Sequence, residues 1–469
     1  MIDDASSAAP DDAVGSAAPV PFPKVRKTSL DRADWLSLVV TTFFVLVIYL
    51  FTLAPEVTLG FGGIFSTAAM YGGVPHAPGY PLSTLYGWAF VHLVPISNVA
   101  WRMAAASAIA GALACGVIAV IVSRLGTAFV DDDLGDDLTA QKQNITLRVA
   151  AGWTAGAVFG FSDDFWNRAV IADVWTLSTL SLCIVFFFLL RWTQAPDCKH
   201  HLYFAFLTYG LALTNSQALL IIAPAIPFVV MTGSRDVGRD LFLGGVVLCT
   251  AVLIAALLET MPELQISRDG LEPLLAVYII VAVIVFTMTV RLSVATRRIC
   301  TEWKTVVICC AFLLAGLSLY FYVPIVSMTN PPMNWGYPRT VQGFFHVLSR
   351  GQYERIHLPA DIDGCLKGLW FYVTVLGSSF GWVSLGIALV PFAFNRKIPV
   401  KSRESLLALG ATFLCLGPLL ITVINPYIGN EGRWVVQVFG SLPGVVLAIW
   451  MGCGLVLVGR WVVKRSRLQ

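Results

Sequence analysis

The sequence predicts an all-α polytopic membrane protein with about twelve transmembrane helices, in a range of about ten to thirteen, and three observations support this prediction. Of its 469 residues, 57% are hydrophobic and only 13% are charged, and the mean hydropathy is +0.76. So much apolar surface needs lipid as its solvent. The apolar residues form runs of about 20, the length that crosses the hydrocarbon core. Basic residues collect in alternate loops between these runs.

Twelve segments are candidate spans, and the three short ones, 147–161, 202–215 and 217–232, could be tilted or partly re-entrant. The candidates are 35–54, 99–123, 147–161, 173–190, 202–215, 217–232, 241–258, 273–290, 305–326, 370–394, 404–424 and 434–458. Residues 80–95 are also apolar, but they are short and bounded by prolines. We expect them to form a juxtamembrane helix on the outer surface.

The basic residues orient the chain, because cytoplasmic loops collect Lys and Arg. With the N-terminus inside, 23 of the 31 basic residues are cytoplasmic. The eight outer ones are Arg102, Arg168, Arg268, Arg339, Arg350, Arg355, Lys367 and Arg433. We therefore expect both termini in the cytoplasm. The Asn-x-Thr motif at Asn144 lies on that side, which fits a bacterial inner membrane.

The expected organisation is a disordered cytoplasmic tail, 1–32, followed by one transmembrane domain, 33–465. Its outer loops are expected at 55–102, 162–172, 327–369 and 425–433. A scattered net charge of +3 argues against a nucleic-acid partner. The ten cysteines show no disulfide framework, and no Cys-x-x-Cys or Cys/His spacing indicates a metal site. No cofactor is expected, with a divalent metal left open.

The first outer loop places one histidine in a proline-rich turn. Residues 73–82 hold three prolines and two glycines around His76. Prolines fix the chain direction and remove backbone donors. The turn could present His76 and Tyr80 to a bound head group, and a structural corner between two surface helices is an equal alternative.

The second outer turn carries three carboxylates, Asp163, Asp164 and Asp173. An ionisable group at the membrane edge is costly unless it is paired or functional. For Asp163 and Asp164, capping or solvation is the better interpretation. For Asp173, which begins a helix, capping and catalysis are equally favoured.

The third outer loop combines arginines with aromatic and amide side chains. Guanidinium groups match phosphate oxygens, and aromatic faces stack on sugar rings. An interfacial aromatic belt with anchoring arginines is the alternative. Arg350 and Arg433 are the preferred phosphate ligands. The other candidates for substrate binding in the third loop are Asn334, Trp335, Arg339 and Tyr353.

Four segments together resemble a known family. They are Leu53 to about Leu125, Phe165-Trp-Asn-Arg-Ala-Val-Ile-Ala-Asp-Val-Trp-Thr-Leu177, Gly210-Leu-Ala-Leu-Thr-Asn215, and Asn330-Pro-Pro-Met-Asn-Trp-Gly336 through Tyr353. In this order they resemble the bacterial protein O-mannosyltransferase-like multi-pass membrane family, of the glycosyltransferase C fold type. The resemblance implies a polyprenyl-phosphate-linked sugar as donor, an acceptor hydroxyl, and chemistry on the outer, periplasmic face. It also implies a first-loop carboxylate as general base and cations that stabilise the leaving lipid phosphate.

The sequence departs from this family at the acidic positions. Members commonly carry Trp-Asp-Ser-Gly-Glu-Phe where this chain has Gly-Phe-Gly-Gly-Ile-Phe at 60–65, so Phe61 and Ile64 replace both acids. Glu56 is the nearest upstream carboxylate. The turn at Asn215, a binding candidate through the resemblance, is followed by Ser216 rather than the usual histidine.

Three hypotheses follow from these residues. The first is a working glycosyltransferase with Glu56, Asp163 or Asp173 as base, and the second is a non-catalytic relative that binds or presents a lipid-linked sugar. The third is a transporter or flippase, although we find neither an internal repeat nor a charge in the middle of a span. All depend on the His76 turn, Asp173 and Arg350 sharing one aqueous compartment.

Overall fold

The computed structural model describes residues 29–130, 138–257, 268–351, 359, 362–394 and 398–466. Most of the expected tail, 1–32, lies outside them, as does Tyr353. The helices are α1 (Arg32–Phe51), α2 (Gly62–Tyr71), α3 (Pro81–Leu93), α4 (Val99–Val130), α5 (Leu138–Gly160), α6 (Asp163–Ala169), α7 (Trp175–Gln194), α8 (Lys199–Asn215), η1 (Gln217–Ile222), α9 (Ile226–Gly233), α10 (Arg235–Leu257), α11 (Arg268–Thr296), α12 (Trp303–Leu317), η2 (Ser318–Phe321), α13 (Tyr322–Ser327), α14 (Val341–Leu348), α15 (Ile362–Phe380), α16 (Trp382–Ala393), α17 (Val400–Leu414), η4 (Cys415–Leu419), α18 (Leu420–Ile424) and α19 (Asn430–Ser466).

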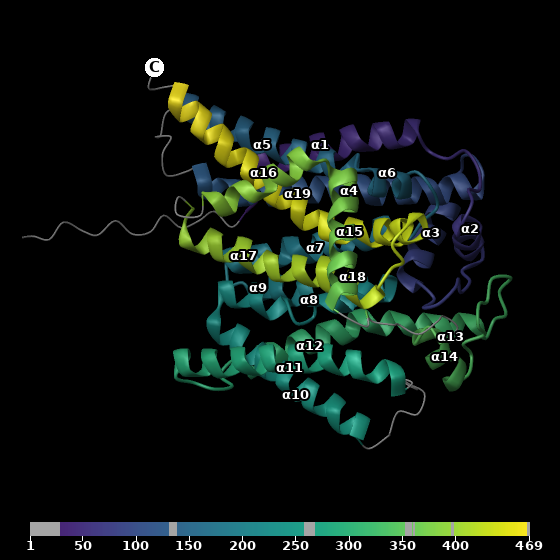
Figure 1. Ribbon diagram of the computed structural model, residues 1–469. Coiled ribbons are helices and arrows are strands. Elements are labelled where there is room, and N and C mark those ends of the chain that lie inside the picture. The colour runs from purple at the N-terminus through teal and green to yellow at the C-terminus, as the bar shows by residue number, and fades with distance from the viewer. Residues whose placement is uncertain are drawn as a thin grey trace, which may run out of the picture.

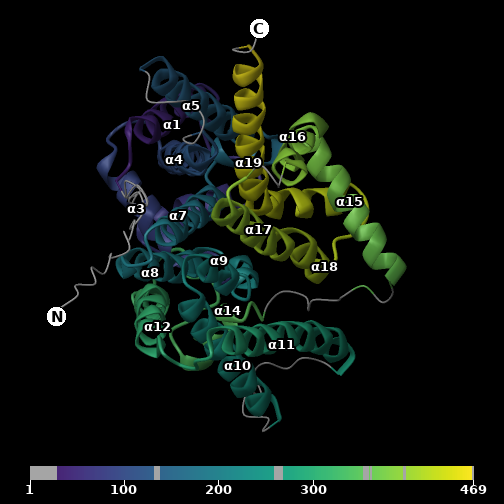
Figure 2. The same ribbon diagram turned by 90° about the vertical axis from the view of Figure 1, so that its left-hand side faces the viewer.

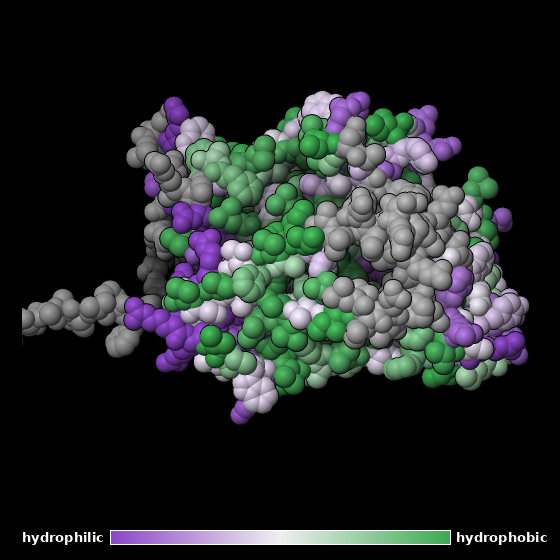
Figure 3. Space-filling model, turned by 60° about the horizontal axis from the view of Figure 1, so that its bottom comes forward, coloured by the Kyte–Doolittle hydropathy of each residue, from purple (hydrophilic) through white to green (hydrophobic). Residues whose placement is uncertain are grey.

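The long helices form a bundle whose two ends differ. In Figure 1, α2, α3, α13 and α14 gather at one end, and the C-terminus lies at the other. Figure 2 shows α1, α4 and α5 on one side of the bundle and α10 with α11 on the opposite side. On the face drawn in Figure 3, hydrophobic residues cover the middle and hydrophilic residues gather toward the ends. This distribution suits a bundle that crosses a bilayer.

The chain is an all-α polytopic membrane protein with eight or nine candidate spans among the described residues. The eight are Arg32–Phe51, Val99–Phe129, Trp175–Gln194, Arg235–Ala255, Tyr278–Thr296, Trp303–Ser327, Ser402–Ile424 and Asn430–Ser466. The predicted twelve spans are not confirmed, because none of the three short candidates forms a helix that is both long enough and apolar enough to cross a membrane. Helix α5 begins with polar residues, α8 has only 17 residues, and the 217–232 segment is divided between η1 and α9.

The span predicted at 370–394 is divided between two helices. Helices α15 and α16 meet at an angle of 105°, and they form the ninth candidate only if the bent pair is one span. Gly381 lies at the bend with φ +78°, a conformation that side chains with a Cβ rarely adopt. Helix α15 consequently runs across the long helices in Figure 1.

Residues 80–95 contain α3, which has 13 residues and packs against α2 and α4. A helix of this length reaches only about 20 Å. The prediction that the segment does not form a span agrees with this length, and its place on the membrane surface stays a prediction.

Small residues bring the central helices into close contact, as is usual between membrane helices. A Cβ on Gly152 of α5 would lie 2.7 Å from the carbonyl oxygen of Ala119 on α4. Between α8 and α12, the same test places a Cβ on Gly210 at 2.3 Å from the Leu313 carbonyl oxygen and one on Gly316 at 2.5 Å from that of Leu207. Glycine therefore sets the spacing of both pairs.

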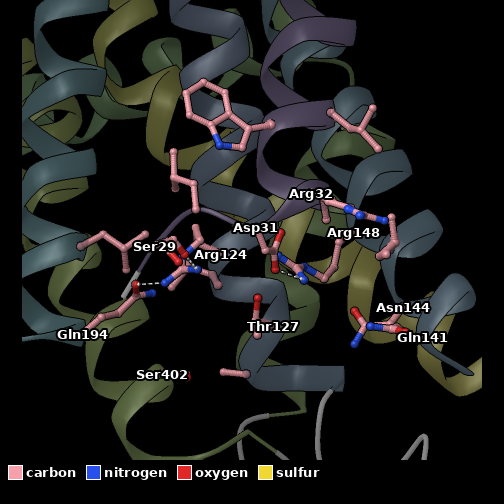
Figure 4. A pocket seen from close by; sticks show the side chains of 18 of the residues that line it. Ser29, Asp31, Arg32, Arg124, Thr127, Gln141, Asn144, Arg148, Gln194 and Ser402 are labelled. Atoms are coloured by element: carbon pink, nitrogen blue, oxygen red, sulfur yellow. Dashed lines mark hydrogen bonds and ion pairs between the residues drawn. The ribbon is translucent and has the colours of Figure 1, made fainter. Parts of the chain in front are cut away.

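A buried ion-pair network of Asp34, Arg124 and Arg148 joins α1, α4 and α5. Figure 4 shows Arg124 and Arg148 at this end of the bundle, with the ion pair from Arg148 to Asp31. Asp34 is 0% exposed and accepts from Ser123 Oγ at 2.7 Å, Arg148 Nη2 at 3.0 Å and Arg124 Nη1 at 3.3 Å. Burial raises the pKa of Asp31, but the hydrogen bond and charge of Arg148 outweigh it, and the net pKa is lowered. A cavity of about 1300 Å³ opens beside this network.

Candidate functional site

The first and third predicted outer loops are joined at the opposite end of the bundle. The backbone N–H of Val74 donates to the carbonyl of Met333 at 2.8 Å, and that of Trp335 donates to the carbonyl of Val74 at 2.9 Å. The Tyr322 hydroxyl, in the segment leading to the third loop, donates to the carbonyl of Gly72. The turn that carries His76 is thus fixed against the loop that carries Asn334.

The second predicted outer turn lies at the same end. The N–H of Ala54 donates to the carbonyl of Val170 at 2.9 Å. Ser107, on α4, bonds both to the carbonyl of Asp173 at 3.0 Å and to its N–H at 3.1 Å. The His76 turn, the Asp173 segment and the Arg350 region therefore share one end of the bundle. Which compartment this end faces stays a prediction.

His76 lies inside a group of aromatic rings, here called the histidine cluster, formed by Phe61, Phe65, His76 and Tyr80. The centroid of the His76 ring is 4.5 Å from that of Phe61, 5.5 Å from that of Phe65 and 5.0 Å from that of Tyr80. Burial lowers the pKa of His76, its bond to the Ala77 carbonyl partly opposes this, and the charge of Arg350 lowers it further. The imidazole is therefore neutral near pH 7.

Phe61 occupies the position where the family resemblance implies a catalytic acid, and its ring faces the histidine. No carboxylate other than Glu56 lies in the first loop, and Glu56 is exposed. The described first loop thus presents a neutral aromatic surface rather than an acid beside His76.

Asp164 is the buried carboxylate at this end that has no hydrogen-bond partner on either oxygen within the described part of the chain. It is 5% exposed, and burial raises its pKa to about 6. Ser379 and Gln437 lie close enough to lower the pKa as hydrogen-bond donors, the charge of Arg433 also lowers it and that of Asp163 raises it, but the effect of burial outweighs the lowering. A carboxylate with a pKa near neutrality and free oxygens can accept or deliver a proton.

Three elements position Asp164. Helix α6 is short and packs against α4, α15 and α19. On α19, Gly440 leaves room for the carboxylate, since a Cβ there would lie 3.1 Å from Oδ2. Phe165, the next residue, is fully buried against Phe159 and anchors the helix.

Asp173 is engaged on both oxygens. Its Oδ1 accepts from the N–H of Trp175 at the start of α7 at 3.0 Å, and its Oδ2 pairs with Arg168 Nη1 at 3.0 Å. The guanidinium of Arg168 also lies 5.4 Å from the ring centroid of Trp434. These contacts favour a capping and positioning role, and a catalytic role for Asp173 stays a prediction.

The remaining acidic candidate, Asp163, is exposed. It accepts from Asn167 Nδ2 at 3.1 Å and from Gln437 Nε2 at 3.3 Å. Neighbouring helix positions differ by about 100°, so Asp163 and Asp164 face opposite environments. The sequence favoured capping or solvation for both residues, and for Asp164 the solvated alternative is wrong because its side chain is 5% exposed. The adjacent aspartates could have indicated the buried one, because only one of two neighbouring residues at the start of a helix can face solvent while the helix packs against the bundle.

The predicted binding residues fall in different places. Asn215 is 0% exposed, and its Nδ2 donates to the Val174 carbonyl at 2.9 Å and to Ser178 Oγ at 2.7 Å, which ties α8 to α7. Asn334 Nδ2 donates to the Ser327 carbonyl at 3.1 Å. Arg433 donates to Ser378 Oγ at 2.7 Å, next to the Asp164 region.

The other third-loop residues lie at the surface. Trp335 and Arg339 are exposed, and Arg339 donates to Asn330 Oδ1 at 3.0 Å. Arg350 is exposed with φ +58° and follows α14, which Gln217 holds through the Leu348 carbonyl at 2.8 Å. Tyr353 lies outside the described residues. The binding roles of this set stay predictions.

Comparison with known proteins agrees with the sequence resemblance. Residues 62–237 match the family described as Protein O-mannosyl-transferase TMEM260 N-terminal domain. The matched range holds His76, Asp164, Asp173 and Asn215. The predicted likeness to protein O-mannosyltransferases is confirmed at this level. The comparisons do not show that the chain belongs to the bacterial family that its sequence resembles.

Two curated relatives carry the same name. The chain is 27% identical to Protein O-mannosyl-transferase TMEM260 of Mus musculus over 215 residues, 45% of this chain and 28% of the relative. It is 24% identical to tmem260 of Dictyostelium discoideum over 434 residues, 87% of this chain and 43% of the relative. The chain thus spans less than half the length of these relatives.

A solved structure is also similar. The crystal structure of ArnT from Cupriavidus metallidurans bound to undecaprenyl phosphate aligns with 93% of this chain and 64% of that chain, at 12% identity and a TM-score of 0.43.

Proposed function

We propose that this protein transfers a sugar from a polyprenyl-phosphate-linked donor to an acceptor hydroxyl, at the end of the bundle that holds His76, Asp164 and Asp173. The observation that carries the proposal is the carboxylate of Asp164, which is buried, forms no ion pair in the described part of the chain and has its pKa raised to about 6 by burial. The names of the TMEM260 relatives support the reaction class.

Asp164 replaces the three bases expected from the sequence. In the proposed step, the acceptor oxygen forms a bond to the anomeric carbon, and the bond from that carbon to the lipid phosphate breaks. The hydroxyl proton passes to Asp164, and the phosphate leaves with the bonding electron pair. Arg433 and Arg350 supply positive charge for the phosphate, as guanidinium groups do well.

The histidine cluster has a binding role in this proposal. Its neutral imidazole and aromatic rings offer a surface for a sugar or an isoprenoid rather than for a second negative charge. Asn334 and Trp335, held beside the cluster by the Val74 bridge, extend that surface.

A second candidate function is a non-catalytic relative that binds the lipid-linked sugar. The observation that favours it is Phe61, whose ring lies 4.5 Å from His76 at the position where the family resemblance implies an acid. In this case the donor binds and no turnover follows, whatever the protonation of Asp164.

The two functions separate in one experiment. Purified full-length protein in nanodiscs receives a radiolabelled polyprenyl-phosphate sugar, with binding and transfer or hydrolysis followed together. The proposal expects turnover that falls by at least about a hundredfold in Asp164→Asn, the range for loss of a general base. Asp163→Asn is the matched control, because its carboxylate is exposed one position away.

Donor binding without turnover in the wild-type protein would support the second candidate. Equal turnover in Asp164→Asn and the wild type would remove Asp164 from the reaction. Thermal unfolding of each variant shows whether a loss of turnover reflects chemistry or folding.

A further inference from the structure

The turn between α7 and α8 brings together one thiol and two imidazoles at the end of the bundle opposite the candidate site. They belong to Cys198, His200 and His201. Each offers one ligand atom, and these atoms lie within 4.8 Å of one another. Cys198 is the residue before the first turn of α8, and both histidines follow in that turn, so all three ligands come from four consecutive residues.

The geometry points to a metal site. We propose that Cys198 Sγ and one ring nitrogen from each of His200 and His201 bind a single divalent ion of borderline softness, such as Zn²⁺, with water at the remaining position. Thiolate and imidazole together suit Zn²⁺. On binding, the thiol of Cys198 loses its proton to solvent, and the sulfur donates an electron pair to the ion.

The orientation of the rings supports this proposal. The ring centroids of His200 and His201 are 4.1 Å apart. Nδ1 of His201 lies 3.3 Å from the Cys198 carbonyl oxygen. In the tautomer in which Nδ1 donates its hydrogen to this oxygen, Nε2 carries the lone pair that can bind a metal. A backbone carbonyl that holds one ring nitrogen is the usual support of a metal-binding histidine.

The three ligand atoms, which lie within 4.8 Å of one another, must move closer together to bind one ion. Ligand atoms of a tetrahedral zinc site lie about 3.5 Å apart, given the metal–ligand distances. Cys198 and His201 are half-buried and His200 is exposed, so rotation of the side chains can supply the contraction.

No metal site was predicted from the sequence, because it has no Cys-x-x-Cys motif and no Cys/His spacing that indicates one. Cys-Lys-His-His is a contiguous set that becomes a cluster only at a helix start. Helix α8 begins at Lys199, whose Nζ is held by Glu302 at 2.8 Å and turned away from the ligands toward α12.

The test uses Co²⁺ as a spectroscopic probe on the metal-stripped full-length protein in detergent. One equivalent should produce thiolate-to-cobalt charge-transfer absorption, which Zn²⁺ abolishes. Cys198→Ser should remove that absorption, whereas Cys300→Ser, at an exposed cysteine between α11 and α12, should leave it unchanged. His201→Gln should weaken binding at least about tenfold, and the exposed His92→Gln should not.

A second measurement needs no variant. In the wild-type protein, Zn²⁺ should slow alkylation of Cys198 relative to Cys300, as measured by peptide mass spectrometry. Equal alkylation of Cys198 with and without Zn²⁺, or cobalt absorption that persists in Cys198→Ser, would overturn the proposal. Sugar transfer plays no part in these assays, so their outcome is independent of the proposed function.

Discussion

Asp34 at one end of the bundle and Asp164 at the other are both buried carboxylates, but they differ in how their charge is compensated. Asp34 accepts hydrogen bonds from Ser123, Arg124 and Arg148, so its charge is compensated by groups from α4 and α5. Asp164 has no ion pair in the described part of the chain, and neither of its oxygens has a partner at full hydrogen-bond geometry there, although Ser379 and Gln437 lie near enough to lower its pKa. A satisfied buried charge holds helices together, whereas an unsatisfied one costs stability and is retained for another purpose. The comparison separates a structural acid from a candidate catalytic acid.

The largest effect is expected on turnover from Asp164→Asn. The amide cannot accept a proton, so transfer should fall by about 10²- to 10⁴-fold. The same change removes an unbonded buried charge, so the melting temperature should stay equal or rise. The measurement is initial-rate transfer in nanodiscs beside thermal unfolding. A fall in both quantities would make Asp164 a structural acid like Asp34.

The opposite pattern is expected for Asp34→Asn. The change breaks the buried ion pairs of Asp34 with Arg124 and Arg148, although Arg148 keeps its pair with Asp31, and costs about 3–5 kcal/mol. The observable is a lower melting temperature in detergent. Asp31→Asn is the matched control, since its side chain is 35% exposed and its pair with Arg148 should contribute less than about 1 kcal/mol. Equal losses in the two variants would contradict the comparison.

The pH dependence should follow Asp164. A general base acts when deprotonated, so the transfer rate should fall about tenfold per pH unit below its pKa of about 6. The stability of the folded protein should depend on pH in the opposite direction to the transfer rate. Because the folded pKa lies above the ordinary value of 3.8, Asp164 favours the folded state at low pH, and this contribution is lost as the pH rises through about 6. A rate that is independent of pH between 5 and 7 would contradict this assignment.

A smaller effect is expected from Asp173→Asn. The amide oxygen can still accept from the N–H of Trp175, but the ion pair with Arg168 is lost. We expect a destabilisation of about 1–3 kcal/mol, between the loss of a helix cap and the loss of a fully buried ion pair, because the two side chains are 17% and 6% exposed. The readout is the melting temperature, with Arg168→Gln as the partner variant. A hundredfold loss of transfer with unchanged donor binding would restore Asp173 as the base.

The smallest effect is expected from Phe61→Asp. Phe61 is 44% exposed, so the bundle tolerates the change, and the new carboxylate should raise the pKa of His76. Histidine NMR titration measures this shift, with Phe61→Asn as the uncharged control. A gain of transfer in Phe61→Asp, from a wild type that shows none, would favour the non-catalytic candidate. An unchanged His76 pKa would contradict the ring contact.

Composition and basic residues were enough to predict the membrane bundle, because both depend on the whole chain rather than on single side chains. Composition and basic residues did not predict the bend between α15 and α16, where a single glycine sets the backbone conformation. Gly381 bends α15 against α16, and a hydropathy pattern is the same for a straight helix and a broken one. The grouping of the three outer segments was predicted and is observed at one end of the bundle. The choice between Asp163 and Asp164 depended on which face of a seven-residue helix meets α19, and that contact is non-local.

The most direct test of the account is the protonation of Asp164 itself. Infrared difference spectroscopy on the reconstituted protein, with ¹³C-labelled aspartate, detects the carbonyl band of a protonated carboxyl as the pH changes. The account predicts a band that disappears with a midpoint near pH 6 and is missing from Asp164→Asn while it remains in Asp163→Asn. A midpoint near pH 4, or an unchanged band in Asp164→Asn, would show that this carboxylate is an ordinary one.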